Sequence, residues 1–353
     1  MSTKITLPKS LTAVTVKLIN PVHFGPAIIS SFLSPPVDRV ETLADLQPSF
    51  SFLIEHPSGR NLVFDLGLRK DFENYSPAIR DHLLRIFPQI ETSRHVAEIL
   101  AEGGVKGSDI EAVIWSHGHW DHIGDPSTFP PTTNLVVGPG FTAALLPGAP
   151  ANPDSPILES DYAGRKLREI TFAADAPLVG QFPAYDYFGD GSFYLLDTPG
   201  HAVGHMCGFA RTSIDQDTFV LLGGDAAYYT GVLRPSAYSK IPDTLLPHMC
   251  LSGPFPSDIG QSFARLQEQR GRKSTDPLFE PTFGEDVPEA IRTVRKLQEL
   301  DGDERIFIII SHDVAVRDCV KHFPESLNDW KREGWRDKAR WGFLRDVQPH
   351  WAT

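Results

Sequence analysis

Four side chains that can bind a metal ion fall within six consecutive positions, as His117, His119, Asp121 and His122. The apolar run 112–115 comes directly before them and predicts a buried strand that ends at these residues. Side chains two positions apart on an extended backbone point the same way, so His117 and His119 can hold one ion. Asp121 and His122 lie past a bend and can hold a second. A single histidine is usually a surface or core residue, but this combination favours zinc, with iron or manganese as alternatives.

The same arrangement, a strand followed by a glycine or serine turn and then a histidine or aspartate, occurs three more times. His201 follows the predicted strand 192–196, Asp225 follows 218–222 and His312 follows 305–310. Functional loops gather at one end of the sheets in layered α/β folds, so we expect these side chains to converge. Two ions need about three protein ligands each plus a shared bridge. We therefore predict a dinuclear centre, with ligands assigned as follows: His117, His119 and His201 on one metal, Asp121, His122 and His312 on the other, and Asp225 bridging.

These segments together carry a family resemblance. In order and context over roughly residues 13–313, the stretches 117–122, 198–201, 223–225 and 311–312 resemble the metallo-β-lactamase superfamily. The resemblance implies an α/β fold, an αββα sandwich with a dinuclear metal site at one sheet edge. Aspartate at position 225, in place of cysteine, departs from the true zinc β-lactamases and is similar to the lactonase and glyoxalase II branches. Histidine at position 119 is unlike the flavodiiron branch, which has glutamate there.

Tyr228 lies three positions after Asp225 and narrows the resemblance. It is similar to a tyrosine of the N-acyl homoserine lactone lactonases, which implies contact with the substrate carbonyl; the alternative is a packing residue. The longer gaps after His122 and Asp225 imply a different pocket, and the chain also resembles fungal lactonase-like lactamases acting on benzoxazolinones. The resemblance implies that His205 supports the metal ligands from behind. Asp65 and Asp313 are expected either to orient ligand imidazoles or to cap turns.

The predicted activity is that of a metal-dependent hydrolase opening a small cyclic ester or amide, a lactone or lactam. Hydroxide held between the two metals would attack the carbonyl, Tyr228 would donate to the carbonyl oxygen, and Asp121 would move the proton. One alternative is a thioesterase of the glyoxalase II or polyketide-releasing kind. A non-enzymatic alternative is a metal-binding scaffold, which would be expected to lack a ligand.

Composition limits the partners of the chain. Among 353 residues, 33 Lys and Arg face 45 Asp and Glu, a formal net charge of -12 that disfavours nucleic acid. The three cysteines, Cys207, Cys250 and Cys319, are too few and scattered for a disulfide framework, which favours a reducing compartment. Neither a signal peptide nor a membrane span is recognisable. We expect a cytoplasmic protein with a small-molecule substrate and no membrane partner, and its oligomeric state is left open.

The chain is predicted to form one domain over 1–353, with a helical and loop cap inserted at 230–303 and a C-terminal helical extension at 314–353. Tyr229, Tyr238, Phe255 and Phe263 are expected either to wall the pocket or to pack, and Trp120 is left between the same two roles. Residues 20–47 and 142–165 are expected to be irregular loops. Further elements are expected as strands at 13–19, 50–56, 61–65, 134–137 and 206–211, and as helices at 77–87, 94–103, 257–270 and 287–300.

Overall fold

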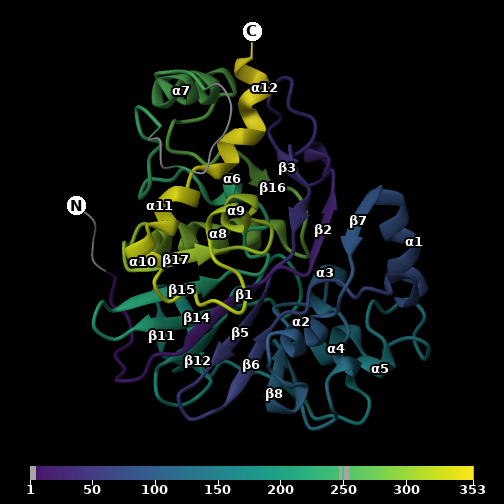
Figure 1. The fold of residues 1–353 in the computed structure, drawn as a ribbon. Coiled ribbons are helices and arrows are strands. Elements are labelled where there is room, and N and C mark those ends of the chain that lie inside the picture. Colours follow the sequence, from purple (N-terminus) through teal and green to yellow (C-terminus); the bar gives the residue numbers. More distant parts are fainter. Residues whose placement is uncertain (1–4, 246–248, 250–254, 353) are drawn as a thin grey trace.

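Two six-stranded sheets packed face to face form the centre of the molecule (Figure 1). A computed structural model describes residues 5–245, 249 and 255–352. The first sheet has the order β1-β5-β6-β8-β9-β10 and the second β11-β12-β13-β14-β15-β17. The strands of the first sheet are Thr15–Ile19, Ser51–Glu55, Asn61–Phe64, Ile110–Ile114, Asn134–Val137 and Leu167–Glu169. Those of the second are Leu178–Val179, Phe182–Asp186, Phe193–Asp197, Met206–Ser213, Thr218–Leu222 and Ile306–Ile309.

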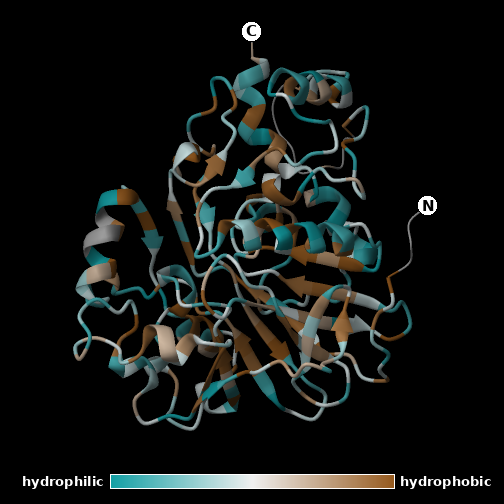
Figure 2. Cartoon of the chain, turned by 180° about the vertical axis from the view of Figure 1, so that it is seen from behind, coloured by the Kyte–Doolittle hydropathy of each residue, from teal (hydrophilic) through white to brown (hydrophobic). Residues whose placement is uncertain are grey.

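Alternate residues of these strands make the core between the sheets. Val16 and Leu18 of β1 meet Val220 and Leu222 of β15 in one buried cluster, together with inward residues of the neighbouring strands. Leu221, which points the other way, belongs to a second cluster under the helices. This alternation is what a period of two on a pleated strand dictates. Figure 2 shows the apolar strands inside and the hydrophilic helix surfaces outside, so the predicted αββα sandwich is confirmed.

Two groups of helices flank the sandwich, one associated with each sheet (Figure 1). Helix α8 illustrates why the sequence folds this way. Its residues Ala290, Val294 and Leu297 are buried at helical spacing, and the Asp286 side chain caps its start by accepting from the Glu289 backbone N–H at 2.9 Å. The helices on the side of α8 (Val287–Asp301) also include α6 (Thr230–Leu233), α7 (Ile259–Gln269), α9 (Val314–Cys319), α10 (Trp330–Glu333), α11 (Trp335–Ala339) and α12 (Gln348–Trp351). Those near the first sheet are α1 (Pro77–Ile86), α2 (Val96–Glu102), α3 (Trp120–Ile123), α4 (Phe141–Leu145) and α5 (Glu159–Tyr162).

The expectation of irregular structure at 20–47 is wrong in part. This segment contains β2 (Val22–Gly25), β3 (Leu33–Ser34) and β4 (Gln47–Pro48). β2 pairs with β4 and with β7 (Gln89–Thr92), and β3 pairs with β16 (Glu280–Pro281). We call the β3 and β16 pair the ribbon. The short strands exist because distant segments supply their hydrogen bonds, which is information that a local pattern does not contain. Residues 142–165, also expected to be a loop, begin within α4 and include α5.

A buried ion-pair cluster ties the C-terminal helices to the region 230–303. The guanidinium of Arg234 contacts the Asp301 carboxylate at 2.7 Å, and the Arg340 guanidinium contacts the same carboxylate at 2.7 Å. All three side chains are buried, so removing one partner would leave an uncompensated charge. The tail therefore packs firmly on the body of the molecule, and Trp330, Trp335 and Trp341 are buried with it.

The cysteines depart from expectation. Cys207 is buried with a free thiol, but Cys319 takes part in a disulfide, and Cys250 lies outside the described residues. The cysteine count consequently no longer supports a reducing compartment. Within the described part of the chain, every helix is too short or too polar to cross a membrane.

Candidate metal centre

The loops that carry the predicted ligands meet at one edge of the sandwich. β6 runs parallel to β8, and β15 runs parallel to β17, so the carboxyl ends of these strands lie at the same edge of their sheets. His117 follows β8, His201 follows β13, Asp225 follows β15 and His312 follows β17. The strand-end pattern seen in the sequence is thus the device that assembles the site.

The structure brings His117, His119, His201 and Asp225 into one group of possible ligands. His119 Nδ1 lies 3.0 Å from His201 Nε2, and His201 Nε2 lies 3.4 Å from Asp225 Oδ2. His117 Nε2 is 4.0 Å from the same carboxylate oxygen. His119 occupies the N-cap of α3, whose extended backbone turns its ring toward that of His117.

A second group holds Asp121, His122 and His312, again with Asp225. The Nε2 atoms of His122 and His312 lie 3.3 Å and 3.2 Å from Asp225 Oδ1. The Asp121 Oδ2 atom lies 3.6 Å from His122 Nε2 and 3.4 Å from His312 Nε2. All seven predicted ligands are therefore together, and Asp225 offers one oxygen to each group.

This donor set fits a pair of divalent cations. Ligand atoms bound at 2.0–2.1 Å in a tetrahedron lie roughly 3.3 Å apart, close to most of the separations measured here. His117 Nε2, His122 Nε2 and Asp225 Oδ1 are buried without a hydrogen-bond partner. Buried polar atoms without partners are costly, and a cation at each group would satisfy them.

The protonation states of Asp225, His117 and His201 suit cation binding, whereas the carboxylates of Asp225 and Asp121 outweigh burial and raise the pKa of His122 and of His312. Burial alone would raise the pKa of Asp225, but the neighbouring His312 and His122 lower it well below its usual range. The Asp225 carboxylate, which both groups share, is therefore held in its charged form. Burial also lowers the pKa of His117 and of His201, which keeps these imidazoles neutral and able to coordinate.

Other side chains fix the direction of the ligand rings. Asp65 Oδ2 contacts His122 Nδ1 at 2.8 Å and accepts from the Ser116 hydroxyl at 2.7 Å, while its Oδ1 accepts from the Ser116 backbone N–H at 2.6 Å. His312 Nδ1 lies 2.6 Å from the Pro48 carbonyl oxygen. Each contact engages Nδ1 and leaves Nε2 facing the centre. Asp65 thus takes the orienting role, whereas Asp313 caps α9 by accepting from the Val316 N–H at 3.0 Å.

His205 supports the bridging residue. Its Nε2 accepts the Asp225 backbone N–H at 3.0 Å, and its Nδ1 contacts the Thr198 hydroxyl at 2.8 Å. Burial lowers the pKa of His205 to about 3, so the ring is neutral and can accept. Gly224 makes this approach possible: its φ is +49°, and a Cβ there would lie 2.8 Å from His205 Nε2.

Tyr228 is placed beside the centre, but its hydroxyl has other partners. The hydroxyl donates to the Phe32 carbonyl oxygen at 2.5 Å and accepts from the Phe283 backbone N–H at 3.4 Å. Its ring centroid lies 5.4 Å from that of His201. Phe32 precedes β3 and Phe283 follows β16, so the hydroxyl bonds both sides of the ribbon end. The expected donation to a substrate carbonyl would require this bond to break.

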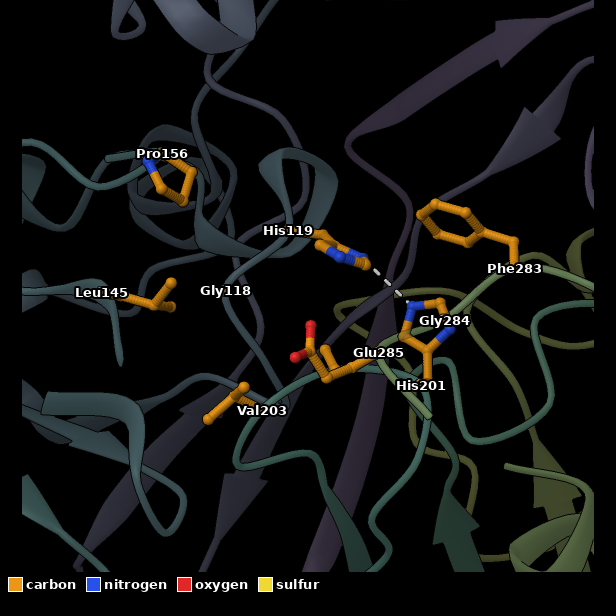
Figure 3. A pocket seen from close by; sticks show the side chains of 10 residues that line it. Gly118, His119, Leu145, Pro156, His201, Val203, Phe283, Gly284 and Glu285 are labelled. Carbon is orange, nitrogen blue, oxygen red and sulfur yellow. Dashed lines mark hydrogen bonds between the residues drawn. The ribbon is translucent and has the colours of Figure 1, made fainter. Parts of the chain in front are cut away.

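A cavity of about 290 Å³ opens onto the first ligand group (Figure 3). Of the two roles left open for the aromatic residues near the insertion, packing is the one seen: Phe263 and Tyr229 are buried in the core and Phe255 packs against it, while Tyr238 is exposed. The aromatic side chain of the cavity is instead Phe283, whose ring centroid lies 5.8 Å from those of His119 and His201. The cavity is lined by Gly118, His119, Leu145, Pro156, His201, Ala202, Val203, Phe283, Gly284 and Glu285.

Two sequence expectations about the surroundings are thereby settled. Trp120 packs against Phe24 and Phe87, with ring centroids 4.9 Å and 5.5 Å away, and does not line the cavity. Phe283 and Glu285 were missed. They lie in an irregular stretch between a two-residue strand and α8, where no periodicity or ligand spacing points to a function.

Asp71, His95 and Asp125 form a further cluster of possible ligands. The two carboxylates of this cluster are already paired with the positively charged side chain of Arg69. The guanidinium of Arg69 lies 3.0 Å from the Asp71 carboxylate and 3.2 Å from that of Asp125. The group is a buried ion-pair network behind α3, and the guanidinium disfavours a metal ion there.

Comparison with known proteins gives consistent matches over most of the chain. Residues 44–307 match the family model described as the metallo-beta-lactamase superfamily. The chain is 40% identical over 352 residues to "Metallo-hydrolase mfmC" of Annulohypoxylon moriforme, covering 97% of this chain and 90% of that protein. It is 39% identical to "Gamma-lactamase FDB1" of Fusarium pseudograminearum over 356 residues, covering 98% and 85%. Among solved structures, a mutant of B. thuringiensis AiiA with N-decanoyl-L-homoserine bound at the active site matches with a TM-score of 0.57 and 20% identity, over 90% of this chain and all of that one.

Proposed function

The chain belongs to the metallo-beta-lactamase superfamily, and from this premise we propose that it is a hydrolase that opens a small lactone or lactam. The observation that carries the proposal is the meeting of seven ligands in two groups, with Asp225 between them. The similarity to a protein named gamma-lactamase supports a cyclic amide or ester as substrate. A cavity of about 290 Å³ suits a small ring.

We propose that two divalent ions, zinc or alternatively iron or manganese, occupy the centre. His117, His119 and His201 would hold one, and Asp121, His122 and His312 the other, with Asp225 between them. Bound ions of this kind lower the pKa of a coordinated water, to about 7 for zinc, and polarise a carbonyl oxygen.

The side chains of the protein would then position the ring and move a proton. Phe283, with Leu145 and Val203 among the lining residues, would hold the apolar part of the substrate and exclude water. The Asp121 carboxylate, placed beside both His122 and His312, would carry the proton to the departing oxygen or nitrogen. We assign Tyr228 the role of holding the ribbon in place, because its hydroxyl already donates to Phe32.

The inserted region contributes to the same pocket. Phe283, Gly284 and Glu285 line the cavity, which supports the proposal that residues 230–303 act as a cap. The net charge of -12 supports a small-molecule substrate over nucleic acid. A thioesterase remains the second candidate within the family, since the same ligands suit acyl transfer from sulfur. A scaffold without activity is disfavoured because none of the seven ligands is lost.

The experiment combines metal analysis with a substrate panel. Purified protein would be loaded with zinc, iron or manganese, analysed by mass spectrometry, and assayed with one lactone, one lactam and one thioester. We expect two ions per chain and turnover of a cyclic substrate. Asp225→Ala should lose bound metal and at least about a hundredfold in activity together, because the shared ligand is gone.

The control is Asp175→Ala, which removes one exposed carboxylate away from the centre. This variant should keep the metal content and the turnover of the parent. Full metal content and full turnover in Asp225→Ala would overturn the assignment of the site. Turnover of the thioester alone would favour the thioesterase.

A further inference from the structure

The segment between β16 and α8 is held directly on the metal-binding loop. The Glu285 backbone N–H donates to the His201 carbonyl oxygen at 3.0 Å, and the Asp286 N–H donates to the Gly200 carbonyl oxygen at 2.9 Å. Gly284, with a φ of +146°, lies so close that a Cβ there would be 3.1 Å from the Gly200 oxygen. The backbone of this segment is therefore fixed relative to a metal ligand, and the side chains on it face the site in a defined way.

Glu285 places a carboxylate in the cavity. Figure 3 shows its side chain reaching into the space between Val203 and His119. Among the ten lining residues there is no lysine or arginine, and Glu285 is the one carboxylate. Within the described part of the chain no side-chain hydrogen bond or ion pair of Glu285 is seen, and the residue is exposed to solvent at the cavity.

A carboxylate that has no protein partner and lies at the opening of a reaction site attracts or repels a charged ligand that enters the site. Two like charges repel one another weakly in water and more strongly where water is partly excluded. The same field attracts a cation and accepts a hydrogen bond from a neutral donor. Ring opening adds water across the acyl bond and yields a carboxylic acid, which loses its proton near neutral pH, together with an alcohol or an amine. The product therefore carries a carboxylate that the substrate lacked.

We propose that Glu285 is a specificity-determining residue that disfavours carboxylate-bearing substrates and weakens binding of the acid product. The second part rests on the proposed hydrolase function. The substrate class that follows is a neutral or cationic lactone or lactam, with an apolar portion against Phe283 and a hydrogen-bond donor available to Glu285.

The test uses two probes that differ in one charge, γ-butyrolactone-3-carboxylate and its 3-carboxamide. In the metal-loaded protein, Glu285→Gln should raise kcat/KM for the carboxylate relative to the carboxamide by roughly three- to tenfold, because the substitution removes the repulsion and keeps the shape. The gain should shrink when salt rises from about 20 mM to about 500 mM. Glu304→Gln, an equal charge change at an exposed position before β17 and outside the cavity, should leave the ratio unchanged.

A binding measurement separates this inference from the proposed function. Calorimetry would compare 4-hydroxybutanoate with 4-hydroxybutanamide on both variants, and Glu285→Gln should strengthen binding of the acid alone by several-fold. If neither lactone is opened but the acid binds more tightly to the variant, the proposed function fails and only the effect of the Glu285 charge on bound acids stands. If lactones are opened and Glu285→Gln matches the parent in both ratios, the role of Glu285 is wrong.

Discussion

Two histidines of the candidate metal centre are each held by an oxygen atom that contacts Nδ1. The Asp65 carboxylate engages Nδ1 of His122, and the Pro48 carbonyl engages Nδ1 of His312. Such contacts select the tautomer that leaves Nε2 free and raise the basicity of the ring. The φ of Asp65 is +57°, an uncommon conformation for a residue with a side chain, and it places the carboxylate under both Ser116 and His122. We therefore expect the affinity of the site for metal to depend on residues that are not themselves ligands.

His205 offers the clearest test at this scale. His205→Phe keeps the ring volume approximately but removes the acceptor for the Asp225 N–H, which would stay buried without a partner. We expect metal affinity to fall by about 10- to 100-fold, as measured by competition with a chelator. His95→Phe removes another buried histidine outside the centre and should leave the affinity unchanged. Equal affinities in the His205 variant and the parent would show that the hydrogen bond does not position Asp225.

The ligands and their supports differ in how far the sequence reveals them. The candidate ligands lie in four loops that each follow an apolar strand and a small turn residue, so a local pattern was sufficient to select the seven side chains that lie together. The sequence does not indicate the supporting roles of Pro48 and Ser116. Their roles follow from the pairing of β4 with β2 and from the position of Asp65 opposite β8, which are tertiary facts.

At the scale of elements, long strands were predictable and short ones were not. The central strands alternate or are continuously apolar because they fill the core between two sheets. β3 and β16 have two residues each and exist only as partners of one another. Phe283 follows that ribbon, so this side of the cavity is formed by a part of the chain for which the residue pattern predicted no strand.

Tyr228→Phe tests whether the Tyr228 hydroxyl holds the ribbon in place or donates a hydrogen bond to the substrate. The Phe32 carbonyl would keep its bond from the Thr282 N–H at 3.0 Å, so the loss should be modest, about 1 kcal/mol in the free energy of unfolding. A looser ribbon should raise KM several-fold, with kcat within about a factor of two and metal content intact. A large fall in kcat at constant KM would instead indicate donation to the substrate. Tyr187→Phe, which alters a hydroxyl contact with Glu111 instead, is the matched control.

At the scale of the whole molecule, the C-terminal segment closes the structure over the N-terminal loop. Asp346 receives the Ala44 N–H at 2.8 Å and the Tyr229 hydroxyl at 2.8 Å, and all of these groups lie beside the cap. Arg345 contacts Asp45 from the same turn at 3.0 Å. These contacts join residues from both ends of the chain, which explains why the tail packs as part of the body.

The buried Asp346 makes this closure sensitive to pH. Burial raises the pKa of Asp346 from 3.8 to about 6, so the folded protein favours the protonated carboxyl. Because the folded pKa lies above the unfolded one, the stabilisation is fully present below about pH 4 and is lost as pH rises through about 6. At pH 8 the folded state must hold a buried charge, which costs up to about 3 kcal/mol.

Asp346→Asn removes that charge and keeps the shape. The amide oxygen can accept from the Ala44 N–H, and the amide nitrogen can donate to the Tyr229 hydroxyl, so both contacts survive. We expect the variant to be more stable than the parent at pH 8, by up to about 3 kcal/mol in the free energy of unfolding, with the difference vanishing near pH 4. Urea unfolding of both proteins at several pH values checks this. A difference that stays constant across that range would mean that the carboxyl of Asp346 does not titrate in the folded protein. The packing of the C-terminal segment on the N-terminal loop would then not depend on the protonation of Asp346.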